Sequence, residues 1–160
     1  MDRPWLRKFL GFSLLARDRR IHIAPQSVKK VKDKIRSLTQ RSAAVSMSER
    51  IRQLDEYLGG WIGYFALAEL PSAFKSLDGW LRRRLRMCQW HQWKRARTRA
   101  RELRALGLPA LEARKVAGTQ KGYWRISGSP PLSRALTNAY WHRQGLVPLE
   151  IRYAAIRKAW

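Results

Sequence analysis

Cysteine is almost missing from the 160-residue chain, which holds a single one, Cys88. One cysteine excludes an internal disulfide framework and favours a reducing compartment. It also argues against a structural zinc site, which needs four convergent ligands. Cys88 and His91 have a ligand-like spacing, but His22 and His142 stand alone. We therefore expect no metal site and no cofactor.

Long apolar runs are missing too. The apolar N-terminal stretch 9–16 is short, contains Gly11 and Ser13, and ends at the charged segment 17–20 without a small-residue cleavage site. No stretch approaches the ~18 continuous apolar residues of a membrane span. These observations predict a cytoplasmic protein with no membrane partner.

The patterns of self-contained catalysis are absent as well. The aspartates are scattered and form no paired-carboxylate motif for magnesium. The pair Gly59–Gly60 lies inside an apolar helical pattern rather than after a strand, so it is no phosphate-binding loop. No nucleophile elbow frames a serine. We expect a chain that is not an enzyme by itself.

Acidic residues are scarce, since 11 Asp and Glu face 34 Lys and Arg, and the net charge is +23. With 45% hydrophobic residues and eight Trp, the chain is too apolar for a disordered basic tail, so it folds against strong self-repulsion. Such a field favours a polyanionic partner, and nucleic acid is the leading candidate over an anionic membrane surface. The excess of arginine over lysine favours bidentate phosphate contacts and stacking on bases.

Hydrophobic periodicity predicts a mainly α-helical fold after an N-terminal β-hairpin. The apolar segments 9–15 and 21–23 flank a charged turn at 16–20. A first helix opens at Pro25, and a second follows a capping box formed by Ser46 and Glu49.

The pattern of residues 72–105 predicts the longest helix of the chain, which would be the third of a bundle. This helix ends before Gly107 and Pro109. The tail 107–160 is less regular. It predicts helices at about 109–117, from 131 to about 143, and after Pro148, with a loop over 118–131.

Three glycines interrupt the pattern of the second helix. Gly59, Gly60 and Gly63 each cost about 1 kcal/mol relative to alanine in a helix interior, so they need a reason. Close approach of another backbone beside Trp61 and Tyr64 is one explanation, and a break in the helix is the other.

Positive charge is densest in the third helix. Residues 71–106 hold 11 basic and 2 acidic side chains, a net charge of +9. Repulsion along this almost single-signed run should destabilise the free helix, which suggests a polyanionic ligand. A lysine ridge on the first helix is a second candidate. The basic candidates for nucleic-acid contact in these two helices are Lys29, Lys30, Lys32, Lys34, Arg82, Arg83, Arg84, Arg86, Lys94, Arg95, Arg97, Arg99 and Arg101.

Aromatic residues alternate with basic ones in the segments 89–95 and 121–125. This mixture is typical of stacking on unpaired nucleotides, and it adds Lys121, Tyr123 and Arg125 to the candidate contacts. The alternative is that Trp90, Trp93 and Trp124 are apolar anchors that fix basic segments to the core. The apolar stripes predict a structural core that includes Gly60, Trp61, Tyr64, Phe65, Trp80 and Leu85.

Several strings occur together in one order along the chain. They are Phe-Leu-Gly-Phe at 9–12, Gly-Trp-x-x-Tyr-Phe at 60–65, Leu-Asp-x-Trp-x-Arg-Arg-Arg-Leu at 77–85 and Lys-Gly-Tyr-Trp-Arg-Ile at 121–126. Ser-Pro at 129–130 and Ala-Leu-Thr-Asn at 135–138 follow. In these strings the chain resembles the C-terminal part of bacterial group II intron-encoded reverse transcriptase/maturases, over nearly its whole length.

The resemblance implies three parts: the end of the palm at 1–24, the maturase-specific thumb (domain X) at 25–106, and a basic DNA-binding-like tail at 107–160. It also implies group II intron RNA as the partner in splicing, and target DNA or an RNA–DNA duplex during reverse transcription. The family's fingers and catalytic palm would lie upstream, on a separate polypeptide or on a missing segment. Asp55 and Gly59 depart from the family pattern, in which Asn and a basic residue are common.

Two alternatives remain at this stage. The basic tail favours a DNA-binding module for target-site recognition. The apolar strand 9–15, which would pair with other strands in a full enzyme, favours a truncated remnant that has no function by itself.

Overall fold

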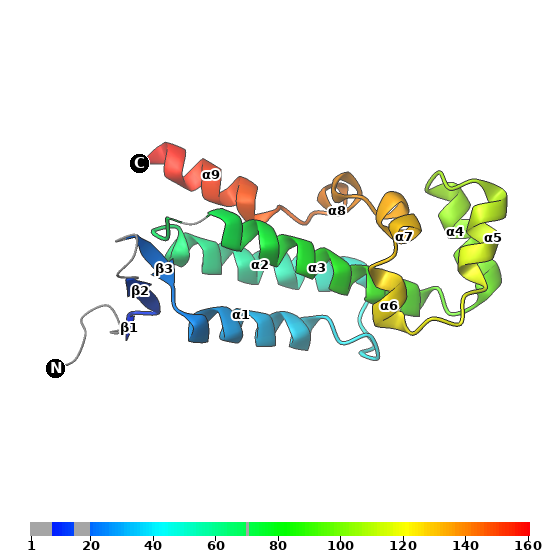
Figure 1. The fold of residues 1–160 in the computed structure, drawn as a ribbon, viewed down its shortest axis with the longest axis horizontal. Coiled ribbons are helices and arrows are strands. Elements are labelled where there is room, and N and C mark those ends of the chain that lie inside the picture. Colours follow the sequence, from blue (N-terminus) through cyan, green and yellow to red (C-terminus); the bar gives the residue numbers. More distant parts are fainter. Residues whose placement is uncertain (1–7, 15–19, 70) are drawn as a thin grey trace.

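The computed structural model describes residues 8–14, 20–69 and 71–160. A small sheet at one end is followed by three long helices that lie side by side and by a set of shorter helices (Figure 1). The strands are β1 (Lys8–Phe9), β2 (Phe12–Leu14) and β3 (Ile21–Ile23), paired antiparallel in that order. The mainly α-helical fold after an N-terminal hairpin is therefore confirmed.

The sheet differs from the prediction in one respect. Strands β2 and β3 form the expected hairpin, but the first predicted strand is divided by a tight turn at Leu10 and Gly11, which both have positive φ (50° and 85°). Glycine tolerates this conformation, and a neighbouring Ser27 hydroxyl donates a hydrogen bond to the Gly11 carbonyl at 3.0 Å. Residues 16–19 of the predicted charged turn lie outside the described residues.

Helix α1 (Pro25–Leu38) begins at the predicted proline, and α2 (Met47–Phe65) follows its predicted cap. The Ser46 hydroxyl accepts a hydrogen bond from the Glu49 amide at 3.2 Å. The Glu49 carboxylate receives hydrogen bonds from Arg52 and Gln53 rather than closing the predicted capping box. Contact with these two side chains lowers the pKa of Glu49 to about 2.

The predicted helix over 72–105 is two helices. Helix α3 (Pro71–Gln92) ends before Trp93, and α4 (Ala96–Ala105) starts after a three-residue break. The break buries both Trp93 and Leu103 in the core, whereas a straight helix would carry the basic run away from it. Burial of two large apolar side chains outweighs the loss of a few helical hydrogen bonds.

The tail is more helical than predicted. Its elements are α5 (Ala110–Ala117), α6 (Tyr123–Ser127), α7 (Pro130–Ala135), α8 (Asn138–Arg143) and α9 (Leu149–Ala159). Helix α6 lies within the predicted loop, where Ile126 and Ser127 are buried and the helix packs on α3. The predicted helix from 131 to 143 is interrupted at Leu136, which is buried, and Thr137 caps the second part.

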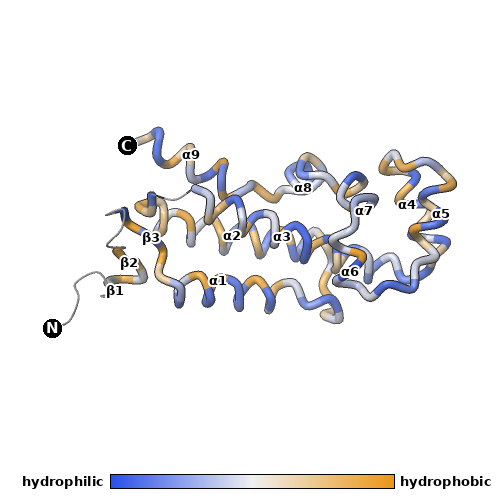
Figure 2. Tube along the Cα trace, in the orientation of Figure 1, coloured by the Kyte–Doolittle hydropathy of each residue, from blue (hydrophilic) through white to orange (hydrophobic). Residues whose placement is uncertain are grey.

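The core lies between α1, α2 and α3 and is closed by α9. The apolar stripe of α2 predicted from its periodicity is buried, namely Ile51, Leu54, Leu58, Ile62 and Phe65. The alternation of hydrophobic and hydrophilic residues that produces this packing is visible along α1 in Figure 2. Helices α4 and α5 lie at the end of the bundle away from the sheet (Figure 1).

Two aspartates hold the C-terminal helix on the bundle. Buried Asp78 accepts hydrogen bonds from the Leu149 and Glu150 amides at 3.0 and 3.1 Å, at the first turn of α9. Asp55 pairs with Arg152 at 2.6 Å and accepts from the Val147 amide at 3.0 Å. Asp55 is thus an anchor for α9.

The three glycines of α2 do not break the helix, and close approach of a backbone is not their explanation. A Cβ built at Gly59 would lie 2.9 Å from Nη1 of Arg152, so this glycine leaves room for a guanidinium group. Within the described part of the chain, nothing lies within 4 Å of a Cβ built at Gly60 or Gly63.

We expect the double variant Gly60→Ala/Gly63→Ala to raise the free energy of unfolding by about 1–2 kcal/mol, because alanine costs less conformational entropy in a helix interior. Urea denaturation measures this. Gly59→Ala is the control and should gain less, since its methyl group displaces the Arg152 guanidinium. A loss of stability in the double variant would contradict the open space at both positions.

Candidate nucleic-acid interface

A basic bundle face covers α1 and the adjoining part of α3. We use this name for Lys29, Lys30, Lys32, Lys34 and Arg36 on α1 with Trp80 and Arg84 on α3. Val31 and Ile35 form the buried apolar stripe of α1. The basic residues of α1 lie on the rest of the helix surface. The lysine ridge predicted from sequence therefore lies on one helix and continues onto its neighbour.

The half-buried ring of Trp80 is the centre of this face. Lys32 Nζ lies 5.7 Å from the ring centroid, and the guanidinium carbons of Arg36 and Arg84 lie 5.3 and 5.6 Å from it. Burial, and secondarily repulsion from Arg36, lowers the pKa of Arg84. The aromatic ring offsets part of the repulsion between three cations that converge on it.

Among the described residues, Asp33 is the one carboxylate that pairs with the α1 cations. Asp33 accepts from Lys29 at 3.0 Å and from Arg36 at 2.8 Å, and these contacts hold its pKa below the ordinary value. Lys34 lies 5.8 Å from the Tyr57 ring, and Lys30 is exposed. The face keeps a strong excess of positive charge.

Three of the predicted arginines of α3 turn toward the protein. Arg83 donates to the Trp124 carbonyl at 3.0 Å, and Arg86 donates to the Ser127 carbonyl at 2.8 Å. Arg84 donates to the hydroxyl and carbonyl of Thr39 at 2.6 and 3.2 Å. Burial, with repulsion from Arg82 and Arg83, lowers the pKa of Arg86 to about 10. These guanidinium groups connect α3 to α6 and to the end of α1.

The tryptophans considered as apolar anchors or as stacking residues differ in burial. Trp90 and Trp93 are buried, with ring centroids 6.3 Å apart, and act as anchors. Trp124 is 39% exposed, with the Arg83 guanidinium 4.0 Å from its ring centroid. The Tyr123 ring lies under Arg41 at 4.6 Å and is half-buried.

The predicted core residues also divide. Phe65 and Leu85 are buried, and Trp61 and Trp80 are half-buried against the core. Gly60 and Tyr64 are exposed, which differs from the prediction. Tyr64 instead attaches the sheet to α2, since its hydroxyl donates to the Leu10 carbonyl at 2.7 Å and its ring stacks on Phe12.

Outside the basic bundle face, the exposed candidates lie at the α3–α4 break, on α4, and on or just before α6. Lys94, Arg95, Arg97, Arg101, Lys121 and Arg125 are exposed. Arg82 is half-buried. Arg99 turns inward, donates to the Trp90 carbonyl at 3.3 Å and lies 4.4 Å from the Trp90 ring.

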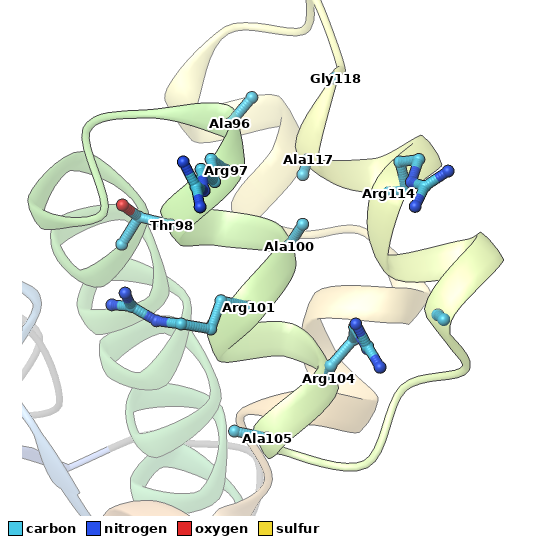
Figure 3. Close-up of a pocket in the computed structure, with 11 residues that line it drawn as sticks. Ala96, Arg97, Thr98, Ala100, Arg101, Arg104, Ala105, Arg114, Ala117 and Gly118 are labelled. Atoms are coloured by element: carbon cyan, nitrogen blue, oxygen red, sulfur yellow. The ribbon is translucent and has the colours of Figure 1, made fainter.

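Sequence reasoning missed two arginines that the helix hairpin of α4 and α5 brings beside predicted ones. Arg104 and Arg114 line a hollow of about 970 Å³ together with Arg97 and Arg101 (Figure 3). Arg104 could have been found from its helical spacing to the other two. Arg114 could not, because only the packing of α5 on α4 places it there.

The remaining chemistry of the described residues is structural. Cys88 is buried, its thiol donates to the Thr39 carbonyl at 3.2 Å, and burial raises its pKa. Within residues 8–14, 20–69 and 71–160, no group of three His, Cys, Asp or Glu side chains could hold a metal ion. Among the helices of these ranges, none is long and apolar enough to cross a membrane.

The basic bundle face is centred on an aromatic ring and lies on a bundle of three long helices. The profile of the group II intron maturase-specific domain matches residues 28–107, which run from within α1 to just past the end of α4. The chain belongs to the family that carries this domain. No curated protein sequence matches the chain.

Proposed function

We propose that this chain is an RNA-binding maturase thumb that binds group II intron RNA and assists its splicing. Family membership supports the choice of RNA, and the basic bundle face supports the mode of binding. The observation that carries the proposal is the convergence of Lys32 and Arg36 on the Trp80 ring within the matched domain, where Arg84, hydrogen-bonded to Thr39, adds a third positive charge. Cations held around an aromatic ring suit a phosphate backbone with exposed bases beside it.

The proposed mechanism uses charge and conformation and no chemistry by the protein. The chain binds the folded intron and stabilises its active structure by mass action, while the RNA carries out the transesterification. In this proposal residues 1–24 are the end of a palm, 25–106 the thumb and 107–160 a basic tail. A fingers and palm polypeptide would be a partner in reverse transcription, with target DNA or an RNA–DNA duplex as its substrate.

The proposal is tested by the binding and splicing of bacterial group II intron RNAs. We expect the 160-residue chain to bind at least one of a panel of these RNAs more tightly than an unrelated structured RNA of equal length. It should also raise the splicing rate at limiting magnesium. Equal affinity for the unrelated RNA would overturn the proposal, and tighter binding of duplex DNA at the same salt concentration would favour target-site recognition instead.

The lysine ridge makes a quantitative prediction. The variant Lys29→Ala/Lys30→Ala/Lys34→Ala should flatten the plot of log K against log salt by about 2 units, since each lost phosphate contact removes roughly 0.7–0.9. Its matched control is Lys75→Ala/Arg143→Ala/Lys158→Ala, which removes the same charge from exposed positions outside the face. Equal slopes for the two variants would exclude the ridge from binding.

A further inference from the structure

The hairpin of α4 and α5 contains a hollow that the basic bundle face does not use. The two helices are joined by residues 106–109 and pack through Leu103 and Ala113, which are fully buried. Between their exposed sides lies the volume of about 970 Å³, which we call the α4–α5 groove. Figure 3 shows Ala100 and Ala117 between Arg101 on one side and Arg114 on the other.

Four arginines line this groove. Arg97, Arg101 and Arg104 are spaced by four and three residues, so they share one face of α4, and Arg114 comes from α5. Arg101 pairs with Glu102 at 2.9 Å. In the part of the chain that the structure describes, the other three have no carboxylate partner within 4.0 Å. Three guanidinium groups are therefore available for an anion.

The rest of the lining is small. It consists of Ala96, Ala100, Ala105, Ala110, Ala117, Gly118 and a single hydroxyl-bearing residue, Thr98. Methyl groups on the floor let a ligand backbone come close to both helices. Because no aromatic side chain lines the groove, a ligand would be held through its phosphates rather than through stacked bases.

The local electrostatics of α4 favour an anionic ligand. Its first turn carries no acidic residue, although the positive end of the helix dipole lies there and basic residues occupy the turn. The like-charged pairs Arg97/Arg101 and Arg101/Arg104, spaced by four and three residues on one helix, repel each other. A phosphate between α4 and α5 would relieve both unfavourable terms.

The dimensions favour one strand over a duplex. The axes of packed helices lie about 8–10 Å apart, so the α4–α5 groove is a furrow on the surface of the two helices, and it is narrower than a duplex, whose major groove alone is ~12 Å wide. From Arg97 to Arg104 the helix rises about 10 Å, a length that a short run of phosphates on one strand can follow.

We propose that the α4–α5 groove binds the backbone of a single-stranded RNA segment through Arg97, Arg104 and Arg114. The choice of RNA over DNA rests on the proposed function, and the Thr98 hydroxyl, which can both donate and accept, can bond a ribose 2′-hydroxyl. This site lies beyond the break in the α3–α4 segment, on different elements from the basic bundle face. It gives the protein a second contact with RNA.

The experiment measures the affinity of the full chain for a fluorescein-labelled 20-nucleotide oligouridine over a range of salt concentrations. The groove variant is Arg97→Ala/Arg104→Ala/Arg114→Ala, and its control is the charge-matched Lys75→Ala/Arg143→Ala/Lys158→Ala. We expect the groove variant to flatten the salt slope by about 2 units and the control by less than half of that. Equal slopes for the two variants would overturn the proposal.

Two further probes identify the ligand. A 20-base-pair RNA duplex should show the same slope with groove and control variants, and a specific loss with the groove variant would overturn the single-strand assignment. Oligothymidine should bind more weakly than oligouridine, and Thr98→Val should remove that difference. Oligothymidine bound as tightly as oligouridine by the unaltered chain would overturn the choice of RNA.

Folding and function are separated by two readouts. The variant Arg97→Lys/Arg104→Lys/Arg114→Lys keeps the charge and should retain most of the salt slope for oligouridine. This variant tests the role of the charge even if the alanine variant does not fold. The groove proposal fails on oligouridine slopes. The proposed function fails on preference for intron RNA, which does not depend on those slopes.

Discussion

Replacing Arg50 by alanine should lower the free energy of unfolding by about 4 kcal/mol. Arg50 is 1% exposed and donates hydrogen bonds at 2.9 Å to the carbonyls of Leu38 and Gln40, with Ala43 at 3.5 Å. The guanidinium group thereby organises the whole connection between α1 and α2. Alanine leaves these carbonyls without a charged donor and opens a cavity, and both changes are costly.

Chemical denaturation of the two single variants Arg50→Ala and Arg52→Ala tests this prediction. Arg52 is two residues away, 62% exposed, and pairs with Glu49 and Glu56 on the surface. Its loss should cost under about 1 kcal/mol, because solvent screens exposed ion pairs. Arg50→Lys should fall between the two, since one ammonium group cannot replace a planar fork. Similar losses for Arg50→Ala and Arg52→Ala would refute the structural role.

Replacing Asp78 by alanine should lower the free energy of unfolding by about 3 kcal/mol and release α9. Its carboxylate is 4% exposed and accepts two amides of the first turn of α9, a contact between segments 71 residues apart. Each hydrogen bond to a charged group contributes roughly 1.5–3 kcal/mol, and the uncovered amides lose their acceptor. Hydrogen exchange should show α9 opening without the bundle.

Asp33→Ala is the control for Asp78→Ala. It also removes a carboxylate, but this one is exposed on α1 and its ion pairs are screened by solvent. It should change stability by under about 1 kcal/mol and leave the exchange of α9 unaltered. Protection of α9 in Asp78→Ala equal to that in the unaltered chain would contradict the anchoring role.

The pH dependence of Asp78 has a definite sign. Burial raises its pKa above the ordinary 3.8, although the Leu149 and Glu150 amides oppose the rise. The folded state therefore holds this proton more strongly than the unfolded state. Stability from this group falls as the pH rises from 3.8 through the raised value. The variant Asp78→Asn should lack that part of the pH profile and keep an acceptor for α9.

The starts of α1 and α2 follow from local chemistry, and so the sequence was sufficient for them, whereas α2 ends at Phe65, before the Pro71 that the sequence suggested as its bound. Pro25 and Ser46 are start signals that act within one turn, and the apolar spacing between them selects one buried face. The end of α3 has no such signal. Trp93 fits a continued helix by its spacing, and the core that buries it beside Trp90 is assembled from other parts of the chain.

The candidate interface was predictable in its charge and not in its geometry. Arg82, Arg83 and Arg84 are three consecutive arginines that the sequence does not distinguish. In the structure, Arg83 and Arg84 donate hydrogen bonds to carbonyl or hydroxyl groups of distant segments. For Arg83 that distinction depends on where α6 packs, 41 residues further along the chain, and for Arg84 it depends on Thr39, 45 residues before it. Likewise, Arg114 joins the α4–α5 groove only through the hairpin. Local pattern gives the number of cations, and tertiary packing decides which ones face outward.

The anchoring of α9 by Asp55 and Asp78 has a consequence for synthesis on the ribosome. Asp78 emerges 71 residues before its partner Leu149, which at 5–20 residues per second is a delay of roughly 4–14 s. During that interval the nascent chain presents two carboxylates and the apolar surface of α2 and α3 that α9 later covers. Docking of α9 is therefore a late folding step. Until then the nascent chain exposes the carboxylates of Asp55 and Asp78, which the folded protein covers with α9.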